Sequence, residues 1–173
     1  MNEWTLNEMD GQLEQFNSEG SVFMATIFDV ADWFLSKEAM TPKKLQKLCY
    51  FYKAWGLALY DGDFLPKSRF EAWVHGPVNP ELHQKYMDYY WNDIPKKDDD
   101  NSAKFSENKL DVLGSMWLSY GDMTDNAIAA ETKVGPWRDA RVGVKDGEVC
   151  TNQLNNEDIK RYYKRLHEAH QGE

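Results

Sequence analysis

Residues 41–60 read TPKKLQKLCYFYKAWGLALY, and this run predicts the central helix of the fold. Thr41 followed by Pro42 is a helix start signal, because the hydroxyl accepts a hydrogen bond from a free amide and proline fits the first helical position. Apolar residues occupy two opposite sides: one carries Leu45, Leu48, Cys49, Tyr52, Trp55 and Leu59, and the other carries Tyr50, Phe51, Ala54, Leu57 and Ala58. Because a helix that is apolar nearly all round is buried, we expect the other elements to pack around this one.

Helix patterns flank this central helix on both sides. Apolar spacing and capping residues predict further helices over residues 22–36, 80–91, 110–121, 124–132 and from 155 onward. Gly135, Pro136 and Trp137 are expected to break the chain, and residues 138–153 to form a loop with a small hairpin between Gly143 and Gly147. A short extended or β element is expected near residues 69–75. The sequence therefore predicts a mainly α fold, a single compact helical domain of about six or seven helices.

Two segments differ from the helical part in composition. Residues 1–20 are polar and indicate an N-terminal tail or extension, whereas residues 21–170 form the expected domain. Within that domain, residues 92–106 contain Pro95 and the acidic run Asp98–Asp100. This composition is typical of a solvated acidic loop on the surface.

Length and charge restrict the class of protein. A chain of 173 residues is most simply one domain, which buries about 70% of the surface of its unfolded form. The net charge of -9, from 29 acidic and 20 basic residues, disfavours binding to nucleic acid through the whole surface, because phosphate contacts need clustered Lys and Arg. The absence of a CxxC pair, a signal-peptide pattern and an apolar run of about 20 residues indicates a cytoplasmic protein that does not span a membrane.

Catalytic and metal-binding patterns are weak. Cys49 lies on the apolar stripe, where a cysteine is usually a core side chain, while Cys150 lies in a polar segment and is expected to be more exposed. His167 and His170 are one helical turn apart but lack further ligands in a known spacing. The chain contains no phosphate-binding GxxxxGKS or GxxxxGKT loop, no GxGxxG and no GxSxG. We therefore expect no enzyme, no metal and no cofactor; the alternative is a hydrolase that pairs His75 with Cys49 or with a carboxylate.

Three lysines lie at the start of the central helix. Lys43, Lys44 and Lys47 occupy its first turns, where positive charge opposes the positive end of the helix macrodipole at a cost of about 0.3–1 kcal/mol each when exposed. A negative surface on a partner would offset that cost; the alternative is a solvated face, where screening by salt removes it. We therefore predict that these lysines are exposed and bind a partner, together with Glu71 and His75 on the polar side of the next motif.

Residues 72–78 read AWVHGPV and predict a tight corner. Gly76 supplies backbone freedom and Pro77 fixes the next dihedral angle, after which a helix start comes at once. Trp73 is expected to anchor the corner to the core, with His75 on its rim. The histidine is therefore interpreted as a structural or partner-facing residue rather than as a catalyst.

These two blocks resemble the Panacea domain, a family also described as the SocA-like or phage GepA-like antitoxin domain. The family pattern is a proline-started helix reading LQKLLYY, followed by an Ala-Trp pair and Gly-Pro-Val. It is matched here by Leu45, Gln46, Lys47 and Leu48, by Trp73, Gly76 and Pro77, and more loosely by Pro136 and Trp137 before the last helix. The resemblance covers about residues 22–168.

The resemblance implies a mainly α-helical antitoxin that neutralises a cognate toxin by direct protein contact. Toxins of the family are diverse and often encoded beside the antitoxin, members are common in phages and prophages, and at least one member is thought to deliver its toxin to an ATP-dependent protease. The family is not known as a family of enzymes. The implied partners are a toxin from an adjacent gene and, if this chain is an adaptor, a protease.

A DNA-binding transcriptional regulator of its own operon is the alternative function. Thr41 and the lysines at residues 43–47 would place a helix start against DNA phosphates. A helix that is apolar on both sides does not read a groove, however, and the net charge of -9 opposes binding. Direct nucleic-acid binding is therefore disfavoured.

Overall fold

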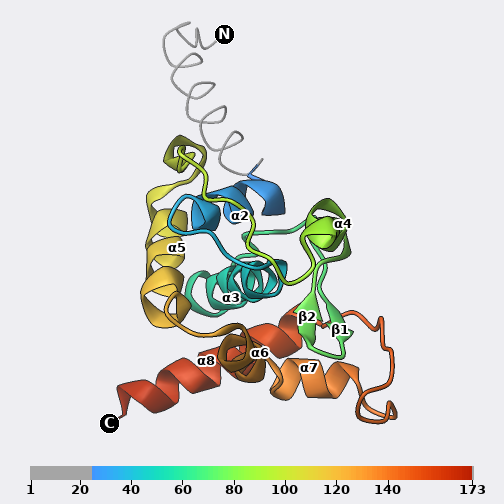
Figure 1. The fold of residues 1–173 in the computed structure, drawn as a ribbon. Helices are drawn as coiled ribbons and strands as arrows, with labels where there is room; N and C mark the ends of the chain where they lie inside the picture. Colours follow the sequence, from blue (N-terminus) through green and yellow to red (C-terminus); the bar gives the residue numbers. More distant parts are fainter. Residues whose placement is uncertain (1–24, 173) are drawn as a thin grey trace, which may run out of the picture.

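The structure is a computed structural model that describes residues 25–172, and it is built around α3 (Pro42–Tyr60) (Figure 1). Helices α2, α4, α5, α6 and α8 and the β-hairpin all contact α3. Its side chains are buried along most of its length, so it is the central helix that the sequence predicts. Seven α-helices and one two-stranded sheet occur in the described residues, which confirms the mainly α fold.

The remaining elements surround α3 on all sides. Figure 1 places α5 on one side of α3 and the hairpin with α4 on the other. In chain order the elements are α2 (Ile27–Leu35), β1 (Glu71–Trp73), β2 (Gly76–Val78), α4 (Pro80–Tyr86), α5 (Glu107–Tyr120), α6 (Asp125–Thr132), α7 (Gly135–Ala140) and α8 (Asn156–Gln171), with short 3-10 helices at Met87–Tyr89 and Ser102–Lys104. Among these described helices, none combines the length and the apolarity that crossing a membrane requires.

Both ends of α3 lie where the sequence places them. The Thr41 hydroxyl accepts a hydrogen bond from the Lys44 amide at 3.2 Å, and Pro42 opens the helix. At the other end Asp61 has a φ of 52°, a left-handed conformation that stops the helix. The start and stop signals are therefore local: a hydroxyl cap followed by proline at one end, and a left-handed residue at the other.

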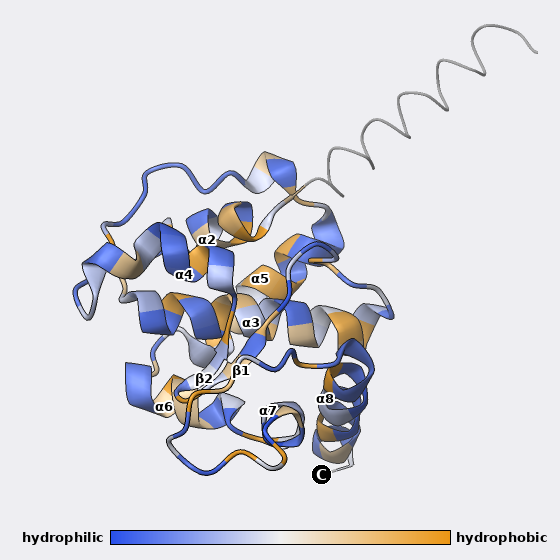
Figure 2. Cartoon of the chain, turned by 90° about the vertical axis from the view of Figure 1, so that its right-hand side faces the viewer, coloured by the Kyte–Doolittle hydropathy of each residue, from blue (hydrophilic) through white to orange (hydrophobic). Residues whose placement is uncertain are grey.

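Aromatic side chains pack α5 and α8 against one side of α3. The Phe51 ring stacks on Tyr120 of α5 with centroids 3.9 Å apart, and Tyr163 of α8 meets the edge of Phe51 at 6.2 Å. Tyr163 also contacts Trp55 at 5.2 Å. Figure 2 shows that α8 turns its polar residues outward, which leaves Ile159 and Tyr163 buried against α3. This side of α3 is held mainly by apolar contacts.

Two helices are shorter than predicted. The helix expected over residues 22–36 begins at Ile27, because Thr26 and Asp29 form a capping box there. The helix expected to reach residue 91 ends with α4 and a 3-10 turn, since Tyr90 has a φ of 53° and cannot continue it. The tail predicted at residues 1–20 lies outside the described residues, as does the first part of the predicted 22–36 helix.

The segment after residue 134 departs furthest from the prediction. Gly135, Pro136 and Trp137 do not break the chain; they open α7, because proline is favoured in the first turn of a helix. Gly143 and Gly147 do not flank a hairpin. Instead the Arg141 guanidinium donates to the Glu148 carbonyl at 2.7 Å and closes the segment as a loop of turns.

Two leucines in the predicted helices, Leu59 on an apolar stripe of the central helix and Leu118 near the end of the 110–121 helix, are exposed. Leu118 is 86% exposed, because it lies five residues after the buried Leu113 and therefore points about 140° away from it around α5. Leu59, in the last turn of α3, is 42% exposed. Apolar spacing alone did not separate these residues from the core.

The acidic loop at residues 92–106 is solvated at its centre and tied down around it. The aspartates at 98–100 are exposed, as predicted. Ile94 is buried and exchanges two backbone hydrogen bonds with Met40, at 2.7 and 3.3 Å. Near the other end Lys104 pairs with Asp29 of α2 at 2.9 Å. The loop is therefore held against α2 and the start of α3.

The extended element predicted near residues 69–75 is the first strand of a hairpin. β1 and β2 are antiparallel, with Ala72 opposite Pro77 and Trp73 opposite Gly76. Gly76 has a φ of 111°, which other residues rarely adopt, so the glycine is required by the turn. A Cβ there would lie 2.6 Å from the Thr132 hydroxyl oxygen, so the space is closed as well.

Candidate functional site

An apolar pocket opens beside the start of α3. It has a volume of about 590 Å³ and lies between the first two turns of α3, the hairpin, α4 and residues 149–151. Its walls are mostly apolar and include Leu45, Trp73, Val78 and Leu82. A concave apolar site with a few polar groups is the usual form of a binding site in proteins.

Exposed apolar side chains surround the mouth of this pocket. Met87, Tyr90 and Val149 line it and are 48%, 68% and 85% exposed; we call these three residues the apolar rim. Trp91, which is 82% exposed, extends the rim, because its ring lies 5.9 Å from that of Tyr90. Neighbouring exposed apolar side chains of this size are typical of interaction surfaces.

One wall of the pocket carries basic side chains. Lys43, Lys47 and His75, three of the residues predicted to bind a partner, all line the pocket, and we call them the basic wall. The structure brings them together because Lys43 and Lys47 are one turn apart on α3 and His75 lies in the hairpin turn above them. Lys43 also donates to the Asn126 side-chain oxygen at 2.9 Å.

Lys47 is buried rather than exposed, which corrects the prediction. Only 1% of it is accessible, and its ammonium donates to the Pro77 carbonyl at 2.9 Å. Burial first, and then the charges of Lys43 and Lys133, lower the pKa of Lys47 to about 7. Burial and the same three lysines also lower the pKa of His75. The pocket therefore contains positive charge that its surroundings disfavour.

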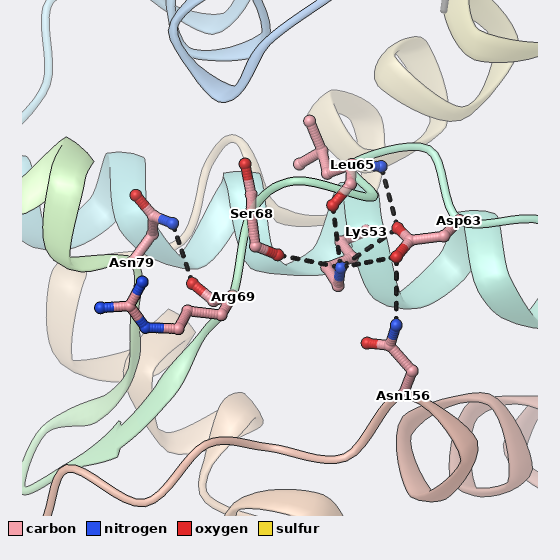
Figure 3. A network of polar contacts seen from close by, with 7 residues as sticks. All are labelled: Lys53, Asp63, Leu65, Ser68, Arg69, Asn79 and Asn156. Atoms are coloured by element: carbon pink, nitrogen blue, oxygen red, sulfur yellow. Dashed lines mark hydrogen bonds and ion pairs between the residues drawn. The ribbon is translucent and has the colours of Figure 1, made fainter.

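The LQKL motif holds the pocket in shape. The Gln46 side chain donates to the Asn79 carbonyl and accepts from the Asn79 amide, both at 2.9 Å. Asn79 in turn caps α4 by accepting from the Leu82 amide, and it donates to the Arg69 carbonyl at 2.8 Å (Figure 3). Gln46 thus fixes the hairpin and the start of α4 relative to α3, and those elements form the pocket walls.

The hairpin is held from its other side by α7. The Trp137 indole donates to the Trp73 carbonyl at 2.8 Å, and the Arg141 guanidinium donates to the Ala72 carbonyl at 2.7 Å. Trp137, part of the family motif, therefore has a structural role. Arg141 was missed by sequence reasoning, because one arginine in a loop carries no local signal of burial.

Two of the predicted partner-binding residues lie away from the pocket. Lys44 donates to the Gly121 carbonyl at the end of α5, where a cation is favourable to that helix. Glu71 is buried, and its carboxylate accepts from the Trp73 indole at 3.0 Å and from Arg69 at 3.2 Å. Both side chains hold the fold together, so neither is free on the surface as the sequence suggested.

Both cysteines are free thiols and both are buried. Cys49 is fully buried in the core, and burial raises the pKa of its thiol. Cys150, expected to be more exposed, is buried and lines the pocket. Cys49 is not among the residues that line the pocket with His75. Within residues 25–172, no three His, Cys, Asp or Glu side chains gather in a way that would hold a metal ion.

The exposure of the rim was also missed by sequence reasoning. Tyr90 of the rim and the neighbouring Trp91 follow Tyr89 directly, and the sequence assigned all three aromatics to the end of a helix. The available signal was the run itself, because three successive large aromatics cannot all face one side of a helix. Val149 carries no such signal, since its contact with the pocket depends on the path of the preceding loop.

Comparison with known protein families adds to this geometry. The profile of the antitoxin SocA-like, Panacea domain matches residues 45–138, more than half of the 173 residues. The match includes the LQKL motif, the hairpin and Trp137, whose contacts shape the pocket. Neither the curated proteins nor the solved structures contain a match to the chain. The chain belongs to the family of antitoxin SocA-like Panacea domains.

Proposed function

We propose that this protein is an antitoxin that neutralises a cognate protein toxin by direct contact, and that the pocket with its apolar rim is the contact surface. The observation that carries this proposal is the exposure of Met87, Tyr90 and Val149 around one concave apolar site. Binding energy at protein interfaces is concentrated in aromatic and apolar anchors near a well-packed centre. A toxin side chain that fills the pocket would cover this rim.

Binding without catalysis is part of the proposal. The buried state of Cys49, with its raised thiol pKa, supports it, because a thiolate nucleophile needs a lowered pKa and an accessible sulfur. The surroundings of His75 support it too, because the charged groups that shift the pKa of that imidazole are lysines. A general base is usually held by a carboxylate or another acceptor.

Contact with a protein is favoured over contact with an operator. Leu45, Leu48 and Tyr52 of α3 are buried, and the hairpin and α4 cover the first turns, so this helix does not present a face to a DNA groove. The net charge of -9 suits a basic toxin, such as one that acts on RNA or nucleotides in the cytoplasm. Both observations support the antitoxin proposal.

The test is rescue of growth in cells that express the product of the adjacent gene. We expect the wild-type chain to restore growth, Val149→Asp to lose rescue, and Leu118→Asp to retain it. The two residues are matched in exposure, at 85% and 86%, but Leu118 belongs to α5, which Figure 1 places on the other side of α3 from the hairpin. Equal rescue by both variants would show that the pocket and its apolar rim are not the contact surface. An adjacent gene whose product is not toxic would contradict the proposed antitoxin function.

The same cells distinguish a blocking antitoxin from a protease adaptor. A blocking antitoxin leaves the amount of toxin unchanged, whereas an adaptor lowers it through an ATP-dependent protease. Immunoblots of a tagged toxin, with and without the antitoxin, measure this directly. We expect the amount of toxin to stay unchanged, because the proposed antitoxin neutralises the toxin by contact and not by degradation.

A further inference from the structure

The charge on Lys47 lacks an acidic partner. The ionisable groups around it are basic: Lys43 on the same helix, His75 in the hairpin turn and Lys133 after α6. No acidic residue is among the groups that shift the pKa of Lys47. From the other pocket walls come His83 and Cys150, which are not acidic. Within the described part of the chain, therefore, the pocket gathers basic side chains without a carboxylate.

The shape of the pocket favours a segment of protein over a small molecule. Most of its wall is apolar, so a bulky apolar group fits its interior, while the basic wall lies at one side. Met87, Tyr90 and Val149 continue the apolar surface outward from the mouth. A small ligand would leave this rim exposed to water, whereas a peptide chain that continues out of the pocket would cover it.

We propose that the pocket binds a segment of the partner protein in which a bulky apolar side chain lies next to a carboxylate, the apolar group entering beside Leu82 and the carboxylate facing Lys43, Lys47 and His75. This inference rests on the proposed function in taking the partner to be a protein, and it specifies the chemistry that the toxin presents. An aspartate, a glutamate or a chain-terminal carboxylate would each supply the negative charge.

Binding of the carboxylate is coupled to uptake of a proton. In the unoccupied pocket the Lys47 ammonium is disfavoured by burial and by Lys43 and Lys133. A carboxylate close to it favours the charged form, so the segment binds the protonated lysine more tightly. Affinity therefore falls as the pH rises above the pKa of the unoccupied site, which is about 7.

The test starts from random 12-residue peptides displayed on phage and selected against the immobilised full-length chain. We expect the selected peptides to carry Asp, Glu or a free carboxyl terminus within two residues of a large apolar residue. Replacing that carboxylate by its amide is expected to weaken binding of the synthetic peptide about tenfold or more. Raising the pH from 6.5 to 8.5 is expected to weaken binding of the acidic peptide about tenfold.

Three variants locate the effect. Lys47→Met is expected to remove both the preference for the carboxylate and the pH dependence. Because Lys47 also binds the Pro77 carbonyl and its replacement can disturb the corner, Lys43→Gln is measured as a second variant, and circular dichroism checks that each is folded. Lys67→Gln, at an exposed lysine beyond the other end of α3, is the matched control and leaves binding unchanged.

Several results would overturn the inference: selection of basic peptides, selection of no peptide, or equal binding of the acid and amide forms. A dimer seen by sedimentation that Val149→Asp dissociates would overturn it as well, since the pocket would then hold a second copy. The peptide results do not depend on the toxin. A neighbouring gene without toxicity therefore contradicts the proposed function alone, while rescue of growth together with negative peptide results contradicts only this inference.

Discussion

Lys47 and Lys53 are both buried in α3 but have opposite surroundings. The Lys53 ammonium is bound by both carboxylate oxygens of Asp63, at 2.9 and 3.1 Å, and by the carbonyls of Leu65 and Ser68, each at 3.0 Å (Figure 3). The Lys47 ammonium donates to one carbonyl, that of Pro77, and Lys47 is among the residues that line the pocket. Removing an acid from a buried cation that has a full set of acceptors destabilises the fold, whereas a buried cation that lacks an acid would gain from a carboxylate supplied by a ligand.

The largest effect is expected from making Lys53 resemble Lys47. Asp63→Asn removes the carboxylate and leaves a buried ammonium unpaired, so the free energy of unfolding in urea should fall by about 3 kcal/mol. Asp61→Asn is the matched control, because Asp61 pairs with Lys160 on the surface, and it should change stability by less than about 0.5 kcal/mol. Similar losses in the two variants would mean that the buried pair has no special weight.

The second prediction concerns the pH dependence that Lys47 imposes. Its pKa in the folded protein is about 7, below the ordinary value of 10.5, so the unfolded chain holds more protons than the folded one between those values. Relative to Lys47→Met, wild-type stability should therefore rise by about 1 kcal/mol per pH unit from pH 7.5 to 9.5, and the penalty of burial should be fully present below pH 7. Urea unfolding at several pH values measures the difference. Parallel stability curves for the two proteins would contradict the unpaired state of Lys47.

A smaller loss is expected at the hydrogen bonds beside Lys47. Gln46→Ala leaves the buried amide and carbonyl of Asn79 without partners and should lower the free energy of unfolding by about 2 kcal/mol. Gln84→Ala, at an exposed position of α4, is the control and should have little effect. An equal effect of both changes would show that the pocket walls do not depend on Gln46.

The smallest effect on stability is expected at the rim. Tyr90 is exposed and has a φ of 53°, a conformation that glycine adopts more readily, so Tyr90→Gly should leave stability unchanged or raise it by up to about 1 kcal/mol. The same change should reduce rescue of growth, because it removes an anchor of the proposed contact. Thermal unfolding and the growth assay together give the answer, and retained rescue in a stable variant would argue against the rim.

Sequence reasoning located the core of this fold but not the state of its polar residues. Thr41 and Pro42 define the start of α3 through local hydrogen bonding and ring geometry, so sequence reveals it. Lys47 was predicted to be exposed because positive charge in the first turns of a helix was taken to indicate contact with a partner. Its spacing from Tyr50 and Ala54 puts it on the second apolar side of the helix, and that spacing was the signal of burial.

The missed parts of the site depend on contacts between distant segments. Trp137 and Arg141 reach carbonyls of β1 that lie more than sixty positions earlier in the chain, and nothing near them in sequence announces the bond. Proline in Gly135-Pro136 was interpreted as a break although it also starts helices, and the two cases differ only in the residues after the proline. Loop paths and buried hydrogen bonds therefore had to come from the structure.

The way in which the hairpin is enclosed also determines how a partner can join it. The backbone groups of Ala72 that point away from β2 are used by Arg141 and Asn152, and across the hairpin Pro77 has no amide hydrogen and gives its carbonyl to Lys47. Neither border of this small sheet offers a free ladder of amides and carbonyls. A visiting strand therefore cannot extend the sheet, and recognition of a partner must depend on side chains, whose chemistry can change from one toxin to another while the backbone stays the same.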